Sequence, residues 1–153
     1  MSPARAGAAL LLSLLVAGCG FWGGGAIQGV DDAAAVAFAR RIEVFYAALE
    51  DVPVAALWTY ESPELHGYFT GRPAFDDYFA SLATQVRSAT LRDGRVERFE
   101  ITEFRLLDPD HAVVELQLVG RHERELRFWE IELPRTDTWE RVRGTWTLRP
   151  DRL

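Results

Sequence analysis

Between residues 38 and 86 the apolar residues recur at the spacing of helices. The first stripe consists of Phe38, Ile42, Phe45 and Leu49. Residues three and four positions apart lie on one helix face, and Asp31-Asp32 supply an N-cap and an acidic first turn. The pattern predicts a helix that ends near Glu50 and leaves Arg40 and Arg41 on its solvated face.

Two short helical segments and a longer helix are predicted after Glu50. Pro53 suits the first turn of a short helix through Trp58. Ser62-Pro63-Glu64 has the order of cap, proline and acid that opens a helical turn. Gly71-Arg72-Pro73 then interrupts the pattern. The helix after this break has apolar residues at helical spacing, namely Phe75, Tyr78, Phe79, Leu82 and Val86.

Beyond residue 95 the period of the apolar residues changes to two, which predicts strands. Phe99 and Ile101 share one parity, whereas Phe104 and Leu106 share the other. A regular strand cannot place all four side chains on one face, so we expect a β-bulge near Thr102-Glu103. The next strand alternates at Ala112, Val114, Leu116 and Leu118.

A third strand is predicted over about 125–133. We expect Trp129, Ile131 and Leu133 to take the core, because they form the apolar parity. Glu130 and Glu132 then form a solvated outer face, where arginines of other strands can pair with them. This arrangement argues against a buried pair of carboxylates that works as acid and base.

The last two strands form a hairpin that turns at Arg143-Gly144. A two-residue turn there places Arg141 opposite Trp146 and Trp139 opposite Leu148. We expect Arg141 to stack on Trp146 as a cation–π pair, with an anion-binding role as the alternative. The whole order predicts an α+β domain, with N-terminal helices packed on one side of a curved antiparallel sheet.

Residues 1–18 have the pattern of a secretion signal. Arg5 gives a positive start, and the apolar run after it is shorter than the roughly 20 residues that span a bilayer. The sequence Leu15-Val16-Ala17-Gly18-Cys19 resembles the lipobox of bacterial lipoproteins. That resemblance implies cleavage before Cys19 and acylation of this residue, the only cysteine in the chain. The alternative is a plain secretory signal with an incidental cysteine.

Residues 19–29 form a glycine-rich tether between the predicted anchor and the domain at 30–153. Phe21 and Trp22 suit a membrane interface, although they can also be ordinary tether residues. In Gram-negative lipoproteins, an aspartate directly after the acylated cysteine resembles a signal for retention in the inner membrane. This chain has Gly20 at that position. We therefore expect a protein anchored by lipid in the bacterial cell envelope, facing the periplasm or the exterior. In a Gram-negative cell the outer membrane is favoured.

The predicted domain resembles the NTF2-like superfamily, which includes SnoaL-like cyclases and ketosteroid isomerases. The resemblance rests on the helix that ends in Phe45-Tyr46-Ala47-Ala48-Leu49-Glu50-Asp51, the helical opening, and the closing hairpin with Trp139 and Trp146 on either side of a tight turn. It implies a cone whose sheet wraps an apolar pocket beside the helices. The superfamily contains enzymes, carriers and interaction domains, so the fold does not fix the function.

Composition excludes several classes of function. The 153 residues suit a single domain, and the net charge of −6 lacks the basic surface of a nucleic-acid binder. One cysteine excludes an internal disulfide and a thiolate zinc cage. The chain contains no lysine, which excludes catalysis through a lysine Schiff base and phosphate binding by a P-loop lysine.

Candidate site residues are few. We expect His66, Tyr46, Arg141 and Trp146 to lie at the pocket. His66 has the reference pKa of a general acid or base, but a surface or packing role competes with that function. No residue is assigned as catalytic, because no aspartate falls within the apolar strands from 95 to 133. No histidine pair has the spacing of metal ligands, and no cofactor is implied.

Three functions remain open after these arguments. The first is a non-enzymatic module that dimerises or binds another envelope protein. The second is a carrier or sensor of a small apolar ligand, which requires an empty cone lined by aromatic rings. The third is an enzyme of the SnoaL or isomerase type, which requires a buried acid or histidine that faces the pocket.

Overall fold

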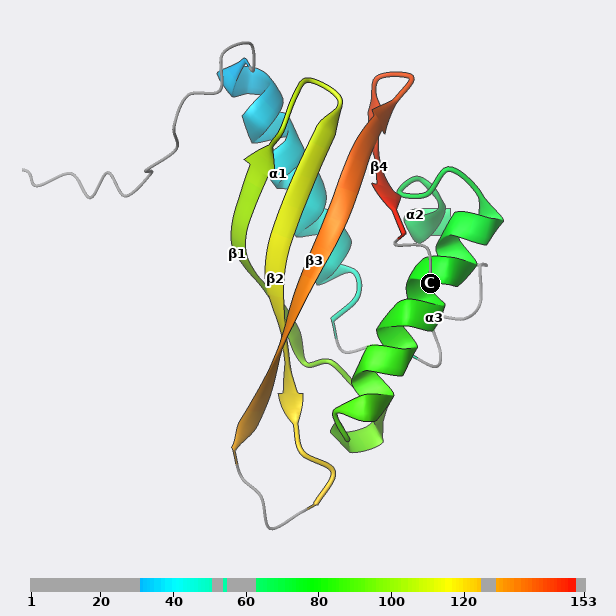
Figure 1. The fold of residues 1–153 in the computed structure, drawn as a ribbon, viewed down its shortest axis with the longest axis vertical. Coiled ribbons are helices and arrows are strands. Elements are labelled where there is room, and N and C mark those ends of the chain that lie inside the picture. The colour runs from blue at the N-terminus through cyan, green and yellow to red at the C-terminus, as the bar shows by residue number, and fades with distance from the viewer. Residues whose placement is uncertain (1–30, 51–53, 55–62, 125–128, 151–153) are drawn as a thin grey trace, which may run out of the picture.

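The protein has an α+β fold in which helices lie against a four-stranded antiparallel sheet of order β1-β2-β3-β4 (Figure 1). The computed structural model describes residues 31–50, 54, 63–124 and 129–150. The helices are α1 (Asp32–Ala47), α2 (Pro63–His66), α3 (Arg72–Ser88) and the 3-10 turn η2 (Arg92–Gly94). The strands are β1 (Arg98–Leu106), β2 (His111–Arg121), β3 (Glu130–Val142) and β4 (Thr145–Arg149).

Several sequence predictions fall outside these ranges. The signal, Cys19 and the tether precede the described residues. Of the short helix predicted from Pro53, only Val54 is described.

Helices α1 and α3 cover the same face of the sheet. The predicted stripes are confirmed, because Phe38, Ile42, Phe45 and Leu49 of the first helical region and all five predicted residues of α3 are buried. Residues of both helices contact one face of β3: Phe45 packs on Trp139, and Tyr78 bonds to Asp137. Asp31 caps α1 as predicted, since its carboxylate accepts the N–H of Ala33 at 3.1 Å.

The predicted bulge and hairpin register are confirmed. The pairing of β1 with β2 shifts between Ile101 and Glu103, which lets the apolar residues before and after it share the core face. Trp139 pairs with Leu148, and Arg141 pairs with Trp146. Arg143 and Gly144 have φ values of 52° and 81°, as a two-residue hairpin turn requires.

The predicted core position of Trp129 is wrong. Its side chain is 57% exposed, while Ile131 and Leu133 are only half-buried at the edge of the core. The β2–β3 hairpin extends beyond α1 (Figure 1), so fewer helical side chains are available to cover this end of β3. Glu130 is solvated as predicted, and Arg98 of β1 donates to both of its oxygens at 3.0 and 2.9 Å.

Arg41 also differs from the prediction, because it is half-buried rather than solvated. Its Nε donates to the carbonyl of Trp146 at 2.7 Å, and a second guanidinium nitrogen donates to the carbonyl of Gly67. The guanidinium also lies 4.3 Å from the centre of the Tyr68 ring. Burial lowers the pKa of Arg41. The side chain thereby joins α1 to β4 and to the turn after α2.

Candidate functional site: a buried carboxylate and an open hollow

Asp137 is a carboxylate in the centre of the molecule, with only 3% of its surface exposed. One carboxylate oxygen, Oδ2, accepts the hydroxyl of Tyr46 at 2.8 Å and the hydroxyl of Tyr78 at 3.0 Å. The other, Oδ1, accepts the Nε–H of Arg135 at 2.7 Å. Side chains from β3, α1 and α3 therefore come together at one buried carboxylate. We call Asp137, Arg135, Tyr46 and Tyr78 the Asp137 cluster.

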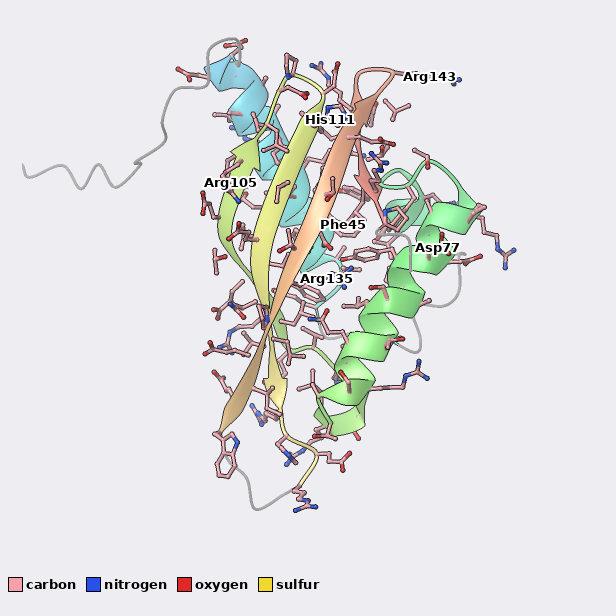
Figure 2. The ribbon with its side chains drawn as sticks, in the orientation of Figure 1. Phe45, Asp77, Arg105, His111, Arg135 and Arg143 are labelled. Carbon is pink, nitrogen blue, oxygen red and sulfur yellow. The ribbon has the colours of Figure 1, made fainter. Side chains whose placement is uncertain are left out.

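The guanidinium of Arg135, like the carboxylate it pairs with, is largely buried and hydrogen-bonded. Its side chain is 10% exposed and lies between β3 and α3, since it contacts Gln85 and Tyr78 (Arg135 is labelled in Figure 2). A terminal nitrogen of Arg135 donates to Oε1 of Gln85 at 3.2 Å, and Nε2 of Gln85 donates to the carbonyl of Pro134 at 2.9 Å. The guanidinium also lies 4.6 Å from the centre of the Tyr78 ring. A buried charge with these partners is compensated.

Burial and the neighbouring carboxylate control the ionisation of the cluster. Desolvation raises the pKa of Tyr46 well above its ordinary value, and the charge of Asp137 raises it further. The same two causes, in the same order, raise the pKa of Tyr78. Burial lowers the pKa of Arg135, but Tyr78 and Asp137 outweigh this effect and the net shift is upward. Both tyrosines thus remain donors and the arginine remains a cation near neutral pH.

Aromatic rings fill the space around this cluster. Trp139 is fully buried, and its ring centre lies 5.4 Å from that of Phe45 and 5.9 Å from that of Phe38. The ring contacts continue through Phe69 to Phe79, whose centres are 5.9 Å apart. Rings at these separations are in direct contact. Among the described residues, these contacts leave no ligand-sized gap between the rings themselves.

A separate hollow of about 390 Å³ opens at the end of the sheet where α1 begins. Its apolar walls come from Ala34, Leu106, Pro109 and Trp146, and its polar walls come from Asp31, Asp108 and Arg141. Figure 1 shows that the start of α1, the β1–β2 turn and the β3–β4 turn lie at this same end. The hollow is open to solvent and distinct from the Asp137 cluster.

The four predicted pocket residues divide between these places. Arg141 and Trp146 line the hollow together. Tyr46 instead donates to Asp137 in the interior. His66 is half-buried on α2 and is not among the residues that line the hollow.

The predicted stack of Arg141 on Trp146 is not among the cation–π contacts of the described residues, in which the arginines are Arg41 and Arg135. The Nε of Arg141 donates instead to the carbonyl of Gly144 at 3.4 Å.

Sequence analysis missed the Asp137 cluster although a signal for it was present. Asp137 is two residues before Trp139 and shares its strand parity, so it faces the core wherever Trp139 does. Asp137 lies just beyond the predicted apolar strands from 95 to 133, which contain no aspartate within their apolar runs. A charged residue of the same parity as a core tryptophan is the pattern that would have found it, and Arg135 continues this parity.

No family model, curated protein or solved structure matches this chain. Within the described ranges, no group of three or more histidine, cysteine or carboxylate side chains is placed to hold a metal ion. None of the helices in these ranges has the length and hydropathy needed to cross a membrane.

Proposed function

We propose that this protein is a lipid-anchored component of the bacterial cell envelope whose domain is a non-enzymatic binding module. The anchor rests on the sequence Leu15-Val16-Ala17-Gly18-Cys19, which has the order of a lipobox at the end of a short apolar run. Acyl chains on Cys19 would hold the protein at a membrane, because each buried CH₂ contributes about 0.8 kcal/mol and two or more chains make attachment stable.

The domain is proposed to be NTF2-like. Support comes from the order of helices followed by antiparallel strands, and from α1 and α3 on a single face of the sheet. The bulge in β1 adds to this support, because a bulge bends a strand and increases the local twist of the sheet.

The close packing of aromatic rings around Trp139 is the observation that carries the binding-module proposal. A carrier of apolar ligands needs an empty volume, but the rings around Trp139 contact one another. An enzyme of the SnoaL or isomerase type needs a buried acid or histidine that faces the pocket. Asp137 is buried, but its two oxygens already accept three donors of the protein itself. These contacts favour a structural role for the interior and a binding role for the surface.

Removal of the predicted lipid anchor tests the localisation. We expect the Cys19→Ala variant to lose labelling by radioactive palmitate and to leave the membrane fraction of a bacterial host. The variant Ser13→Ala, which alters the signal outside the lipobox, serves as the control and should remain labelled in the membranes. Unlabelled wild-type protein in the soluble fraction would contradict the anchor.

Native mass spectrometry of the lipid-anchored protein, extracted in detergent from its own host, tests the binding module. We expect a dimer or a complex with another envelope protein, with no apolar metabolite retained. A retained apolar metabolite would contradict the proposal and favour the carrier. A bare monomer at micromolar concentration would also contradict it.

A further inference from the structure

The hollow at the start of α1 contains charges of opposite sign that do not neutralise each other. Arg141 is exposed, and across the described ranges its guanidinium takes part in no ion pair. Its hydrogen bond to the carbonyl of Gly144 is long, at 3.4 Å. A guanidinium has five N–H donors, so most of the hydrogen-bonding capacity of Arg141 is available to a molecule in the hollow.

Asp31 supplies the opposite charge on the wall formed by α1. Its Oδ1 caps the helix by accepting the N–H of Ala33 at 3.1 Å, which fixes the position of the carboxylate. Within the described ranges no side chain pairs with it. Asp108 also lines the hollow, but Nδ1 of His111 lies 2.9 Å from each of its carboxylate oxygens. Asp31 is therefore the carboxylate better placed to receive a cationic group.

The remaining walls are apolar and the size suits a small molecule. Leu106 and Trp146 contribute to these walls, and the volume of about 390 Å³ falls within the usual range for small-molecule sites. The two carboxylates outnumber the guanidinium, so the hollow repels a simple anion, and a simple cation would leave Arg141 without a partner. A molecule with one positive group, one negative group and an apolar part could contact the carboxylates, the guanidinium and the apolar walls at the same time.

We propose that this hollow binds a small zwitterion of the α-amino acid type. The guanidinium of Arg141 holds its carboxylate, and Asp31 holds its ammonium group. The apolar side chain of the ligand packs on the apolar wall, where Ala34 and Pro109 are the more exposed residues. Charge-assisted hydrogen bonds of this kind are about twice as strong as neutral ones, so both charged ends of the ligand contribute. The inference requires neither the lipid anchor nor the ring packing around Trp139, so it can fail without contradicting the proposed function.

Titration calorimetry of the full, lipid-anchored protein in detergent tests this site, with L-leucine as the probe. We expect a dissociation constant on the order of 1 mM or tighter, as suits a ligand of this size. N-acetyl-leucine lacks the ammonium group and leucine amide lacks the carboxylate. Each should bind about tenfold more weakly or worse, because one charge of the hollow then has no partner.

Matched variants distinguish the hollow from other surfaces. Arg141→Gln and Asp31→Asn should each weaken leucine binding about tenfold or more, and Asn preserves the helix cap. The controls Arg143→Gln and Asp32→Asn remove a charge from the same turn and the same helix start, outside the hollow, and should leave binding unchanged. The proposal is overturned if leucine gives no heat at 10 mM, if both leucine derivatives bind as well as leucine, or if the controls weaken binding equally.

Discussion

Replacement of Asp137 by alanine is expected to lower the free energy of unfolding by about 3–5 kcal/mol, the usual cost of removing one partner from a buried ion pair. The guanidinium of Arg135 would remain inside the protein without its carboxylate, which now accepts at 2.7 Å. The hydroxyls of Tyr46 and Tyr78 would also lose their acceptor. Urea unfolding followed by tryptophan fluorescence measures the change.

Further variants separate the charge from the shape of Asp137. Asp137→Asn keeps the size of the side chain but leaves Arg135 uncompensated, so most of the loss should remain. Combining it with Arg135→Gln removes both charges. We expect the double variant to recover about 0.5–3 kcal/mol relative to the sum of the single variants, because contacting residues in one network couple by this amount.

The control for Asp137 lies on the same strand. Glu132 is exposed on the outer face of β3, and Glu132→Ala should change the stability by less than about 0.5 kcal/mol. If Asp137→Ala were as stable as this control, the cluster would have no structural role. An acid that is buried without benefit to stability would then favour an enzyme over the proposed binding module.

The sequence predicts the frame of the fold because local rules determine it. The stripe from Phe38 to Leu49 has helical spacing, and the same residues are buried in the structure. The reversal of parity after Ile101 predicts the bulge, since a strand has only two faces. The Arg143-Gly144 turn fixes the register of the last hairpin for a similar reason, because a two-residue loop permits one pairing.

Positions that depend on distant parts of the chain were harder to predict. Trp129 has the parity of a core residue, but its exposure depends on how far the helices extend along β3, and α1 does not reach that end (Figure 1). Arg41 lies off the apolar stripe and is nevertheless half-buried, because β4 and the turn after α2 pack beside it. The partners of Asp137 come from α1 and α3, so its parity alone could indicate burial but not the hydrogen bonds that make burial tolerable.

Alkaline solution is expected to destabilise the protein steeply, and the cause lies in the two tyrosines of the cluster. Burial and the charge of Asp137 hold the pKa values of Tyr46 and Tyr78 well above the ordinary value. In the unfolded chain both tyrosines ionise near pH 10, at about the reference pKa. The folded state therefore binds more protons above that pH. The stabilisation is fully present below about pH 10 and is lost as the pH rises toward the folded pKa values.

The expected loss is about 1.4 kcal/mol per pH unit for each tyrosine, or about 2.7 kcal/mol per unit for both. Urea unfolding between about pH 9.5 and 11.5 measures this slope, a window chosen around the reference pKa of tyrosine. Tyr46→Phe removes one of the two ionising groups, so we expect its slope above pH 10 to fall by about half.

Tyr68→Phe is the matched control, because it also removes the hydroxyl of a tyrosine near the cluster. Tyr68 is half-buried and its ring contacts Trp139. Among the described residues, the hydroxyls that donate to Asp137 are those of Tyr46 and Tyr78. This variant keeps both Tyr46 and Tyr78, so the contribution of these two hydroxyls to the slope should be retained. Absorbance at the tyrosinate wavelength gives a second measurement, since Tyr46 and Tyr78 should ionise only as the protein unfolds. Equal slopes for Tyr46→Phe and Tyr68→Phe would show that the hydroxyl of Tyr46 is accessible to hydroxide in the folded protein, and would contradict the sealed Asp137 cluster on which a structural interior depends.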